Sequence, residues 1–216
     1  MLKLYAIPES LYCAKTRILL RHKNLEWEEI LPPGGYGSDE YKTYIPSGNL
    51  PALKVDDFTL ADSEAIAEYL EQQYPSPACL PSHIRNQAKV RELSRFHDTR
   101  LEPCVREFFG IFNGEKLEIP KIQQITQKLN LLVHQLDQLL NEYMSFHNGS
   151  LTLADCGFPI TFLWVKKLEP YLGIRVPLPP SIQNYLSMAY SIPAVQAELN
   201  SYQPILEQFL AEEFQS

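Results

Sequence analysis

The sequence has no long apolar segment, no cluster of basic residues and few cysteines. No apolar run approaches the ~20 residues of a membrane-spanning helix, and the first residues do not show the basic and then apolar pattern of a secretion signal. The net charge is −7, and no stretch concentrates the Lys and Arg that binding to nucleic-acid phosphates requires. We therefore expect a cytoplasmic protein that binds neither membranes nor nucleic acid.

The four cysteines form no CxxC pair, and no histidine lies at the spacing of a zinc site. We therefore expect no bound metal. Buried, reduced thiols are the favoured interpretation for Cys79, Cys104 and Cys156. Hydrophobic residues make up 45% of the 216 residues, which is enough for a folded core.

The first 75 residues alternate between strand-like and helical patterns. Residues 2–7 and 25–30 are typical of strands, and residues 13–23 between them are typical of a helix. A right-handed crossover then makes the two strands parallel, with their carboxyl ends at one edge of the sheet, where ligands usually bind. A short helix is predicted at 39–44, and a hairpin is predicted to turn at Asp56 and Asp57.

A proline-rich linker at residues 76–86 separates this part from a helical one. Two long amphipathic helices are predicted at 90–108, with a kink at Pro103, and at 122–143. Helices of this length bury their apolar stripes against each other, so we expect a bundle.

Thr152 and Asp155 have the spacing of a capping box in front of an apolar helix at 156–165. Such a helix is expected at the centre of the bundle, and the expected role of Asp155 is in folding. Shorter helices are predicted at 181–189, 193–199 and 204–214.

Ser10 lies where the first strand turns into the first helix. The unpaired N–H groups at the start of a helix favour an anion. A serine hydroxyl at that place can donate to a thiolate. The alternative is that Ser10 is only the N-cap of an ordinary helix.

Leu50-Pro51 lies near the start of a predicted strand at 49–55. A proline at such a position indicates a cis peptide bond, which turns the chain sharply. The main-chain N–H and C=O groups of Leu50 would then face outward and could pair with an extended peptide as an added strand.

Asp62 and Ser63 begin an amphipathic helix. Either side chain could simply cap the helix. Alternatively, Ser63 and its N–H bind a ligand carboxylate while Asp62 binds an ammonium, which together hold a zwitterion.

Three motifs together resemble those of the cytosolic glutathione transferases: residues 10–17 (SLYCAKTR), 49–53 (NLPAL) and 62–66 (DSEAI). The resemblance extends over the whole chain and is nearest to the zeta, omega and beta classes. It implies an α/β thioredoxin-like N-terminal domain (1–75), a linker (76–86) and an all-helical C-terminal domain (87–216).

The resemblance also implies a set of site residues. Ser10 would be the catalytic residue, because it would stabilise the thiolate of the cosubstrate glutathione. The glutathione site would consist of Ser10, Leu11, Asn49, Leu50, Pro51, Asp62 and Ser63. The second-substrate pocket would lie between the domains at Pro33, Tyr36, Phe96 and Arg100, with Arg106, Phe108 and Phe109 as further candidates.

The sequence departs from the family pattern at several positions. Residues 10–13 are similar to a glutaredoxin CPYC motif whose first cysteine is replaced by serine, so Cys13 is expected to be packed, with a reactive thiol as the alternative. Leu11 replaces a small hydroxyl residue of the zeta enzymes. Gly48 replaces a glycyl-carboxylate ligand, a role for which Asn49 and Lys42 are candidates. Tyr5 is an alternative source of the activating hydroxyl, although a tyrosine in the core is the simpler interpretation.

These implications favour a homodimeric enzyme of detoxification that transfers glutathione to, dehalogenates or isomerises a small hydrophobic electrophile. The alternative is a binding protein that keeps the fold as a ligand carrier or a partner surface, as do family members that act on the transcription machinery. Retention of Ser10, Pro51 and Ser63 favours the enzyme, because function depends on the site and not on the fold.

Overall fold

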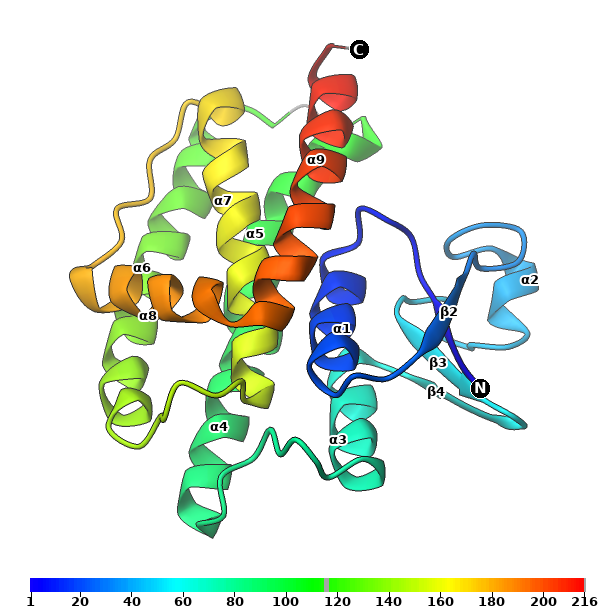
Figure 1. Cartoon of the computed structure of the whole chain (residues 1–216). Helices are drawn as coiled ribbons and strands as arrows, with labels where there is room; N and C mark the ends of the chain where they lie inside the picture. The colour runs from blue at the N-terminus through cyan, green and yellow to red at the C-terminus, as the bar shows by residue number, and fades with distance from the viewer. Residues whose placement is uncertain (115–116, 216) are drawn as a thin grey trace.

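The computed structural model describes residues 1–114 and 117–215. Its first part, called here the sheet region (residues 2–73), combines four strands with three helices (Figure 1). These elements are β1 (Leu2–Tyr5), α1 (Leu11–His22), β2 (Trp27–Ile30), α2 (Asp39–Lys42), β3 (Ala52–Val55), β4 (Phe58–Ala61) and α3 (Ser63–Gln73).

The four strands form one mixed sheet in the order β2-β1-β3-β4. Strands β1 and β2 are parallel, as the βαβ pattern predicts, and β1 pairs antiparallel with β3. Strands β3 and β4 form the predicted hairpin, in which Asp56 adopts φ 54° in the turn. This is the predicted α/β thioredoxin-like arrangement, followed by an all-helical part.

The second part, called here the helical region (residues 84–215), packs beside α1 and α3 (Figure 1). Its elements are α4 (Ile84–Phe96), the π-helical turn η1 (His97–Leu101), α5 (Glu102–Arg106), the 3₁₀ helix η2 (Glu107–Asn113), α6 (Ile119–Met144), the 3₁₀ turn η3 (Leu153–Cys156), α7 (Phe158–Leu172), α8 (Pro180–Ser191) and α9 (Pro193–Gln215). No helix among these residues is long and apolar enough to span a membrane.

The structure corrects the expected boundaries of the helical region in three places. The predicted helix at 90–108 is divided by η1, and Pro103 falls in the first turn of α5, where the missing N–H is least costly. The apolar helix begins at Phe158 because η3 precedes it. The segments predicted at 193–199 and 204–214 are one helix, α9, which contains Pro204.

Packing explains why α9 continues through Pro204. The proline removes one main-chain hydrogen bond. Tyr202, Leu206 and Leu210, which flank it, are almost completely buried. Burial of each such side chain stabilises the folded chain by about 1.5–3 kcal/mol, which outweighs the lost bond.

The connection between the two regions is anchored by one buried carboxylate. Glu71 accepts hydrogen bonds from the main-chain N–H groups of Cys79 and Leu80 and from the ammonium of Lys23. Helix α4 begins at Ile84, inside the predicted linker of residues 76–86. The division into domains remains a prediction of the sequence.

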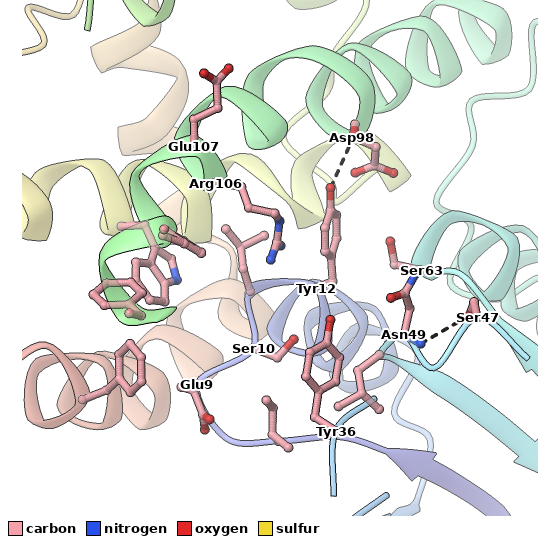
Figure 2. Close-up of a pocket in the computed structure, with 18 of the residues that line it drawn as sticks. Glu9, Ser10, Tyr12, Tyr36, Ser47, Asn49, Ser63, Asp98, Arg106 and Glu107 are labelled. Atoms are coloured by element: carbon pink, nitrogen blue, oxygen red, sulfur yellow. Dashed lines mark hydrogen bonds between the residues drawn. The ribbon is translucent and has the colours of Figure 1, made fainter. Parts of the chain in front are cut away.

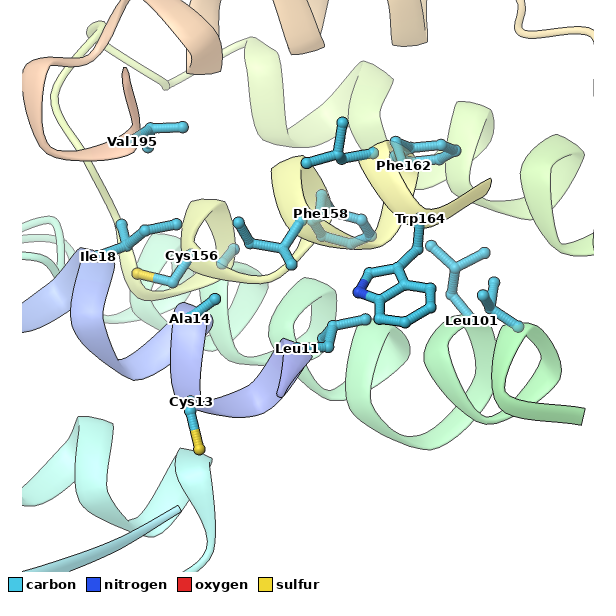
Figure 3. Close-up of a cluster of buried hydrophobic side chains, with 14 of the residues drawn as sticks. Leu11, Cys13, Ala14, Ile18, Leu101, Cys156, Phe158, Phe162, Trp164 and Val195 are labelled. Atoms are coloured by element: carbon cyan, nitrogen blue, oxygen red, sulfur yellow. The ribbon is translucent and has the colours of Figure 1, made fainter. Parts of the chain in front are cut away.

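Helix α1 supplies most of the apolar contact between the regions. Ala14 and Ile18 face α7, close to Cys156 and Phe158 (Figure 3). The Sγ atom of Cys13 points away from α7. All four cysteines are buried and free, as expected for reduced thiols.

Asp155 is the polar centre of the helical region. Its buried carboxylate accepts hydrogen bonds from the hydroxyls of Tyr143 (2.8 Å) and Tyr185 (2.9 Å) and from the main chain of Thr152 (2.8 Å). His147 Nε2 lies 3.2 Å from it, and the Nδ1 atom of the same ring accepts from Gly149 N–H. Asp155 thus forms the predicted capping box with Thr152.

Candidate functional site

A cavity of about 1190 Å³ lies between the two regions, at the edge of the sheet where β1 ends and α1 begins. The first wall belongs to the sheet region and is mostly polar: Ile7, Glu9, Ser10, Leu11, Tyr12, Tyr36, Ser47, Asn49, Leu50, Ala61, Asp62 and Ser63. The second wall comes from η1, α5, η2, α7 and α9 and neighbouring residues, and it is rich in aromatic residues. Figure 2 shows both walls around Ser10 and Tyr12.

Ser10 caps α1 and also faces the cavity. Its Oγ accepts a hydrogen bond of 3.3 Å from the N–H of Cys13. The hydroxyl proton of Ser10 has no acceptor among the described residues, so it is available to a ligand. The capping and ligand-binding interpretations of Ser10 are therefore compatible.

Leu50 presents its main chain to the same cavity. The Leu50-Pro51 bond is cis, as predicted. None of the described residues forms a hydrogen bond with the main-chain groups of Leu50, whereas the neighbouring Asn49 carbonyl accepts from Tyr41. An extended peptide could therefore pair with Leu50 in the manner of an added strand.

The start of α3 lies beside these groups. Asp62 adopts φ 80°, and its Oδ1 accepts from the N–H groups of Glu64 (2.9 Å) and Ala65 (3.1 Å). Ser63 is the first residue of α3, and its hydroxyl has no partner among the described residues. Since the N-terminus of a helix favours negative charge, a carboxylate can bind at Ser63.

A buried cluster of charged side chains holds the start of α3 in place. Glu64 accepts from the ammonium of Lys15 and the hydroxyl of Ser94, both at 2.8 Å. The same ammonium lies 2.7 Å from Asp98 Oδ2. Burial alone would lower the pKa of Lys15, but the two carboxylates raise it above its ordinary value, so the side chain stays charged.

Arg106 supplies positive charge to the opposite wall of the cavity. Its guanidinium lies 5.4 Å from the ring centroids of both Tyr12 and Phe109 and pairs with the buried Glu102. Figure 2 shows it directed toward Tyr12, above Ser10. Nearly half of the Arg106 side chain (47%) remains exposed, so the guanidinium can also contact an anionic ligand.

Tyr12 is held by Glu102, to which its hydroxyl donates at 2.8 Å. Burial and the neighbouring carboxylates of Glu102 and Asp98 raise the pKa of Tyr12 far above its ordinary value. The hydroxyl of Tyr12 is therefore neutral and committed to Glu102, so at the start of α1 it is the Ser10 hydroxyl that is free to donate to a ligand.

Four aromatic rings form the apolar part of the second wall. Trp164 packs against Phe109, Phe112 and Phe209 with centroid distances of 4.5, 6.2 and 6.1 Å. We call these four residues the aromatic wall. An apolar or aromatic compound fits against such a surface.

The structure brings together most of the residues that the sequence indicates. Ser10, Leu11, Asn49, Leu50, Asp62 and Ser63 line the cavity, as do Tyr36 and the further candidates Arg106 and Phe109. Pro51 lies behind Leu50 and is buried. Leu11 is buried, and its side chain points to Trp164, which also lines the cavity (Figure 3).

Three residues predicted for the second-substrate pocket, Pro33, Phe96 and Arg100, do not line this cavity. The carbonyl of Pro33 accepts from Ser38 within its own loop. Phe96 packs against the core and Arg100 is exposed to solvent.

Arg95 and Asp98, which neighbour Phe96 and Arg100 in the sequence, line the cavity instead. Phe108, another candidate, belongs to the core and is 1% exposed.

The alternative activating groups lie outside the cavity lining. Burial raises the pKa of the Cys13 thiol, which disfavours a reactive thiolate. Tyr5 is in the core, with ring centroids 5.5 Å from Tyr41 and 6.5 Å from Tyr44. Lys42 lies beside Gly48 and pairs with Asp39, so Asn49 is the candidate for the glycyl end that lines the cavity.

Sequence reasoning missed most of the aromatic wall. Phe112, Trp164 and Phe209 come from η2, α7 and α9, and their sequence pattern is that of ordinary core residues. Tyr12 is two residues from Ser10 in the motif, so its presence in the site could have been inferred from the sequence. Described residues contain no group of three or more metal-binding side chains.

Comparison with known proteins identifies relatives of both parts of the chain. A family profile described as "Glutathione S-transferase, N-terminal domain" matches residues 4–78. Maleylacetoacetate isomerase of Rattus norvegicus is 31% identical over 146 residues, which is 65% of this chain and 68% of the relative. A stringent starvation protein A homolog of Coxiella burnetii is 26% identical over 203 residues, which is 93% of this chain and 92% of the relative.

Solved structures share the fold along the whole chain. A delta-class glutathione transferase of Nilaparvata lugens superimposes with a TM-score of 0.81 and 21% sequence identity, covering 99% of this chain and 100% of that one. This similarity agrees with the sheet region and helical region described above and shows the common architecture.

Proposed function

Since the chain belongs to the cytosolic glutathione transferase family, we propose that it binds glutathione in the cavity and activates its thiol for attack on a small electrophile. The observation that carries the proposal is the convergence of three ligand-binding groups on one cavity. These are the free hydroxyl of Ser10, the unpaired main chain of Leu50 and the start of α3 at Ser63.

Each part of glutathione has a matching group in the cavity. The γ-glutamyl carboxylate binds to the hydroxyl and N–H of Ser63, and its ammonium approaches the carboxylate of Asp62. The cysteinyl residue pairs with the main chain of Leu50. Asn49 donates its side-chain amide to the glycyl carboxylate.

The thiol then lies at the start of α1. Ser10 donates its hydroxyl proton to the sulfur, and the dipole of α1 favours the thiolate over the thiol. Both effects lower the pKa of the bound thiol, so a larger fraction is nucleophilic at neutral pH. Because the Cys13 thiol is buried beside this helix end, glutathione supplies the reacting sulfur.

The second substrate enters from the helical region. Its apolar part packs on the aromatic wall, and an anionic group pairs with Arg106. Conjugation, dehalogenation and isomerisation all begin with attack of the thiolate on an electrophilic carbon, so each is consistent with this site. The similarity to maleylacetoacetate isomerase makes an anionic cis-alkene the first compound to test.

Calorimetric titration with glutathione tests the proposal directly. We expect one binding site per chain, followed by turnover of at least one compound from a panel of aryl halides, disulfides, peroxides and maleyl-type alkenes. Absence of heat on titration, in a folded protein whose Ser10 and Ser63 remain accessible, would contradict the proposal.

A second function is favoured by one comparison. The stringent starvation protein A homolog aligns with 93% of this chain, against 65% for the isomerase. A protein that uses the same fold to bind a ligand or a partner would bind glutathione weakly or without turnover of any compound in the panel. The same two measurements therefore distinguish the two functions.

We also propose that the protein acts in the cytoplasm, in detoxification, as a homodimer. The apolar stripe of α6, from Ile125 to Tyr143, is buried within the chain, so a dimer would form through other residues of α4 and α6. Light scattering during gel filtration should give twice the mass of the chain, and the mass of a single chain would contradict the dimer.

A further inference from the structure

Tyr202 of α9 connects the aromatic wall to the main chain next to Ser10. The indole N–H of Trp164 donates to the Tyr202 hydroxyl at 2.7 Å. The same hydroxyl donates to the carbonyl of Glu9 at 2.6 Å. Two hydrogen bonds thus join the second-substrate side of the cavity to the residue that precedes Ser10.

The Glu9-Ser10 peptide group is held at both ends. Its carbonyl accepts from Tyr202, and its N–H, which belongs to Ser10, donates to the carbonyl of Ile7 at 3.3 Å. Rotation of this peptide group would turn the Cα–Cβ bond of Ser10 and move its hydroxyl. The bond from Tyr202 therefore helps to set the direction of the Ser10 side chain.

The surroundings of Tyr202 allow a displacement at the aromatic wall to reach the main chain at Glu9. The residue is 1% exposed, and burial raises the pKa of its hydroxyl, which therefore always carries the proton that it donates to Glu9. Helix α9 is fixed against α1 by Glu198, which pairs with Arg17 at 2.6 Å and Arg21 at 2.9 Å. Arg17 also donates to the carbonyl of Pro8 at 3.1 Å.

From this geometry we propose that Tyr202 is a positioning residue that couples occupancy of the aromatic wall to the orientation of Ser10. A compound that packs against Phe109, Phe112 and Phe209 limits the motion of the Trp164 indole. The indole N–H then holds the Tyr202 hydroxyl in the direction of Glu9. The consequence for the thiol of glutathione rests on the proposed function of Ser10.

The coupling is reciprocal, because each ligand must change the affinity of the other by the same factor. Filling of the aromatic wall should tighten glutathione binding, and glutathione should tighten binding at the wall. We expect a factor of about 5 or more, which is within the usual range for linked sites.

The test uses the full chain and the fluorescent probe 1-anilinonaphthalene-8-sulfonate. Tyr202→Phe removes only the hydroxyl, and Tyr190→Phe is the matched control, because the half-buried Tyr190 hydroxyl has no partner among the described residues. NMR spectra report the amide signals of Ser10 and Leu11 with and without the probe. The probe should shift these signals more in the unmodified protein and in Tyr190→Phe than in Tyr202→Phe, where only the direct effect of the nearby aromatic probe remains.

A second measurement gives the apparent pKa of the bound glutathione thiol from its thiolate absorbance. Tyr202→Phe should raise this pKa by about one unit, which is a tenfold loss of thiolate below the pKa. The probe should change glutathione affinity less than about twofold in this variant. Where Tyr202→Phe does not fold, Trp164→Phe removes the N–H donor and should likewise reduce the probe-induced NMR shifts.

The outcomes separate this inference from the proposed function. If the unmodified protein does not bind glutathione, the proposed function fails, and the NMR shifts still decide the coupling. If the probe binds and shifts the Ser10 amide signal equally in Tyr202→Phe and Tyr190→Phe, the coupling through Tyr202 is overturned.

Discussion

The ammonium of Lys15 lies 2.7 Å from the carboxylate of Asp98, although the two residues are 83 positions apart. The pair joins α1 to η1 and is almost completely buried. His97 Nδ1 donates to the other oxygen of Asp98 at 2.7 Å, and its Nε2 lies 2.7 Å from the hydroxyl of Thr161. The sheet region and the helical region are thus connected by charge as well as by apolar contact.

Because of this ion pair, we expect the free energy of unfolding to decrease in acid. Burial opposes ionisation of Asp98, but the hydrogen bond from His97 and the charge of Lys15 outweigh it, and the pKa of Asp98 lies well below its ordinary value. A lowered pKa contributes stability above the unfolded value of about 4, and this contribution disappears as the pH falls through the folded pKa. Urea unfolding should therefore show a free energy that decreases below about pH 4.

Asp98→Asn should remove that acid dependence in part and reduce the free energy of unfolding at pH 7 by about 3 kcal/mol, because Lys15 keeps only Glu64 as its partner. Asp39→Asn is the control, since Asp39 is fully exposed. If the free energy of unfolding decreases equally with falling pH in the unmodified protein and in Asp98→Asn, Asp98 is not the group responsible for the acid dependence.

Replacement of the activating hydroxyl should reduce turnover far more than binding. Ser10→Ala removes the donor to the thiolate, and we expect a fall of about 10²–10³ in kcat with a small change in glutathione affinity. The matched control is Ser187→Ala, on the exposed side of α8. Loss of activity in Cys13→Ser with retention in Ser10→Ala would instead indicate cysteine-based reduction.

Ser63 should determine the affinity of the protein for glutathione. Ser63→Ala removes one hydrogen bond to the γ-glutamyl carboxylate, and a bond to a charged group contributes about 1.5–3 kcal/mol. Glutathione should therefore bind at least about tenfold more weakly, as measured by calorimetry, and kcat should change little. An unchanged Kd would place the γ-glutamyl group elsewhere.

Arg106 should select for charge on the second substrate. For two electrophiles of similar shape, Arg106→Gln should lower kcat/KM for the anionic one by about 10-fold or more, while the neutral one changes by less than about 3-fold. Arg100→Gln is the control, because Arg100 is exposed and outside the cavity lining. Arg106→Lys keeps the charge and should restore part of the preference.

Asp155 should affect stability and not chemistry. Asp155→Ala leaves the buried hydroxyls of Tyr143 and Tyr185 without their acceptor. Buried unsatisfied groups cost about 1–3 kcal/mol each, so the free energy of unfolding should fall by at least about 3 kcal/mol. Urea titration checks this value, and Asp39→Ala should change it by less than about 0.5 kcal/mol.

Local sequence patterns were sufficient for the architecture and for the polar wall of the cavity. The strand-helix-strand order, the cis bond before Pro51 and the position of Ser63 at a helix start all depend on a few neighbouring residues. Hydrophobic periodicity and proline chemistry act over that range, so the sequence analysis could predict them. Continuity of α9 through Pro204 was not predictable, because burial of distant partners outweighs a local signal.

The sequence by itself determined that a serine hydroxyl, a bent proline segment and an Asp-Ser helix start occur in the order of a thiol-binding site. Only the tertiary structure decided which residues of the helical region lie opposite these three elements. Arg95, Asp98 and Arg106 line the cavity, whereas Phe96 and Arg100 do not. Packing of α7 and α9 on α1 brings Trp164 and Tyr202 to Ser10. Contacts between residues so far apart depend on the packing of whole helices, which no local pattern encodes.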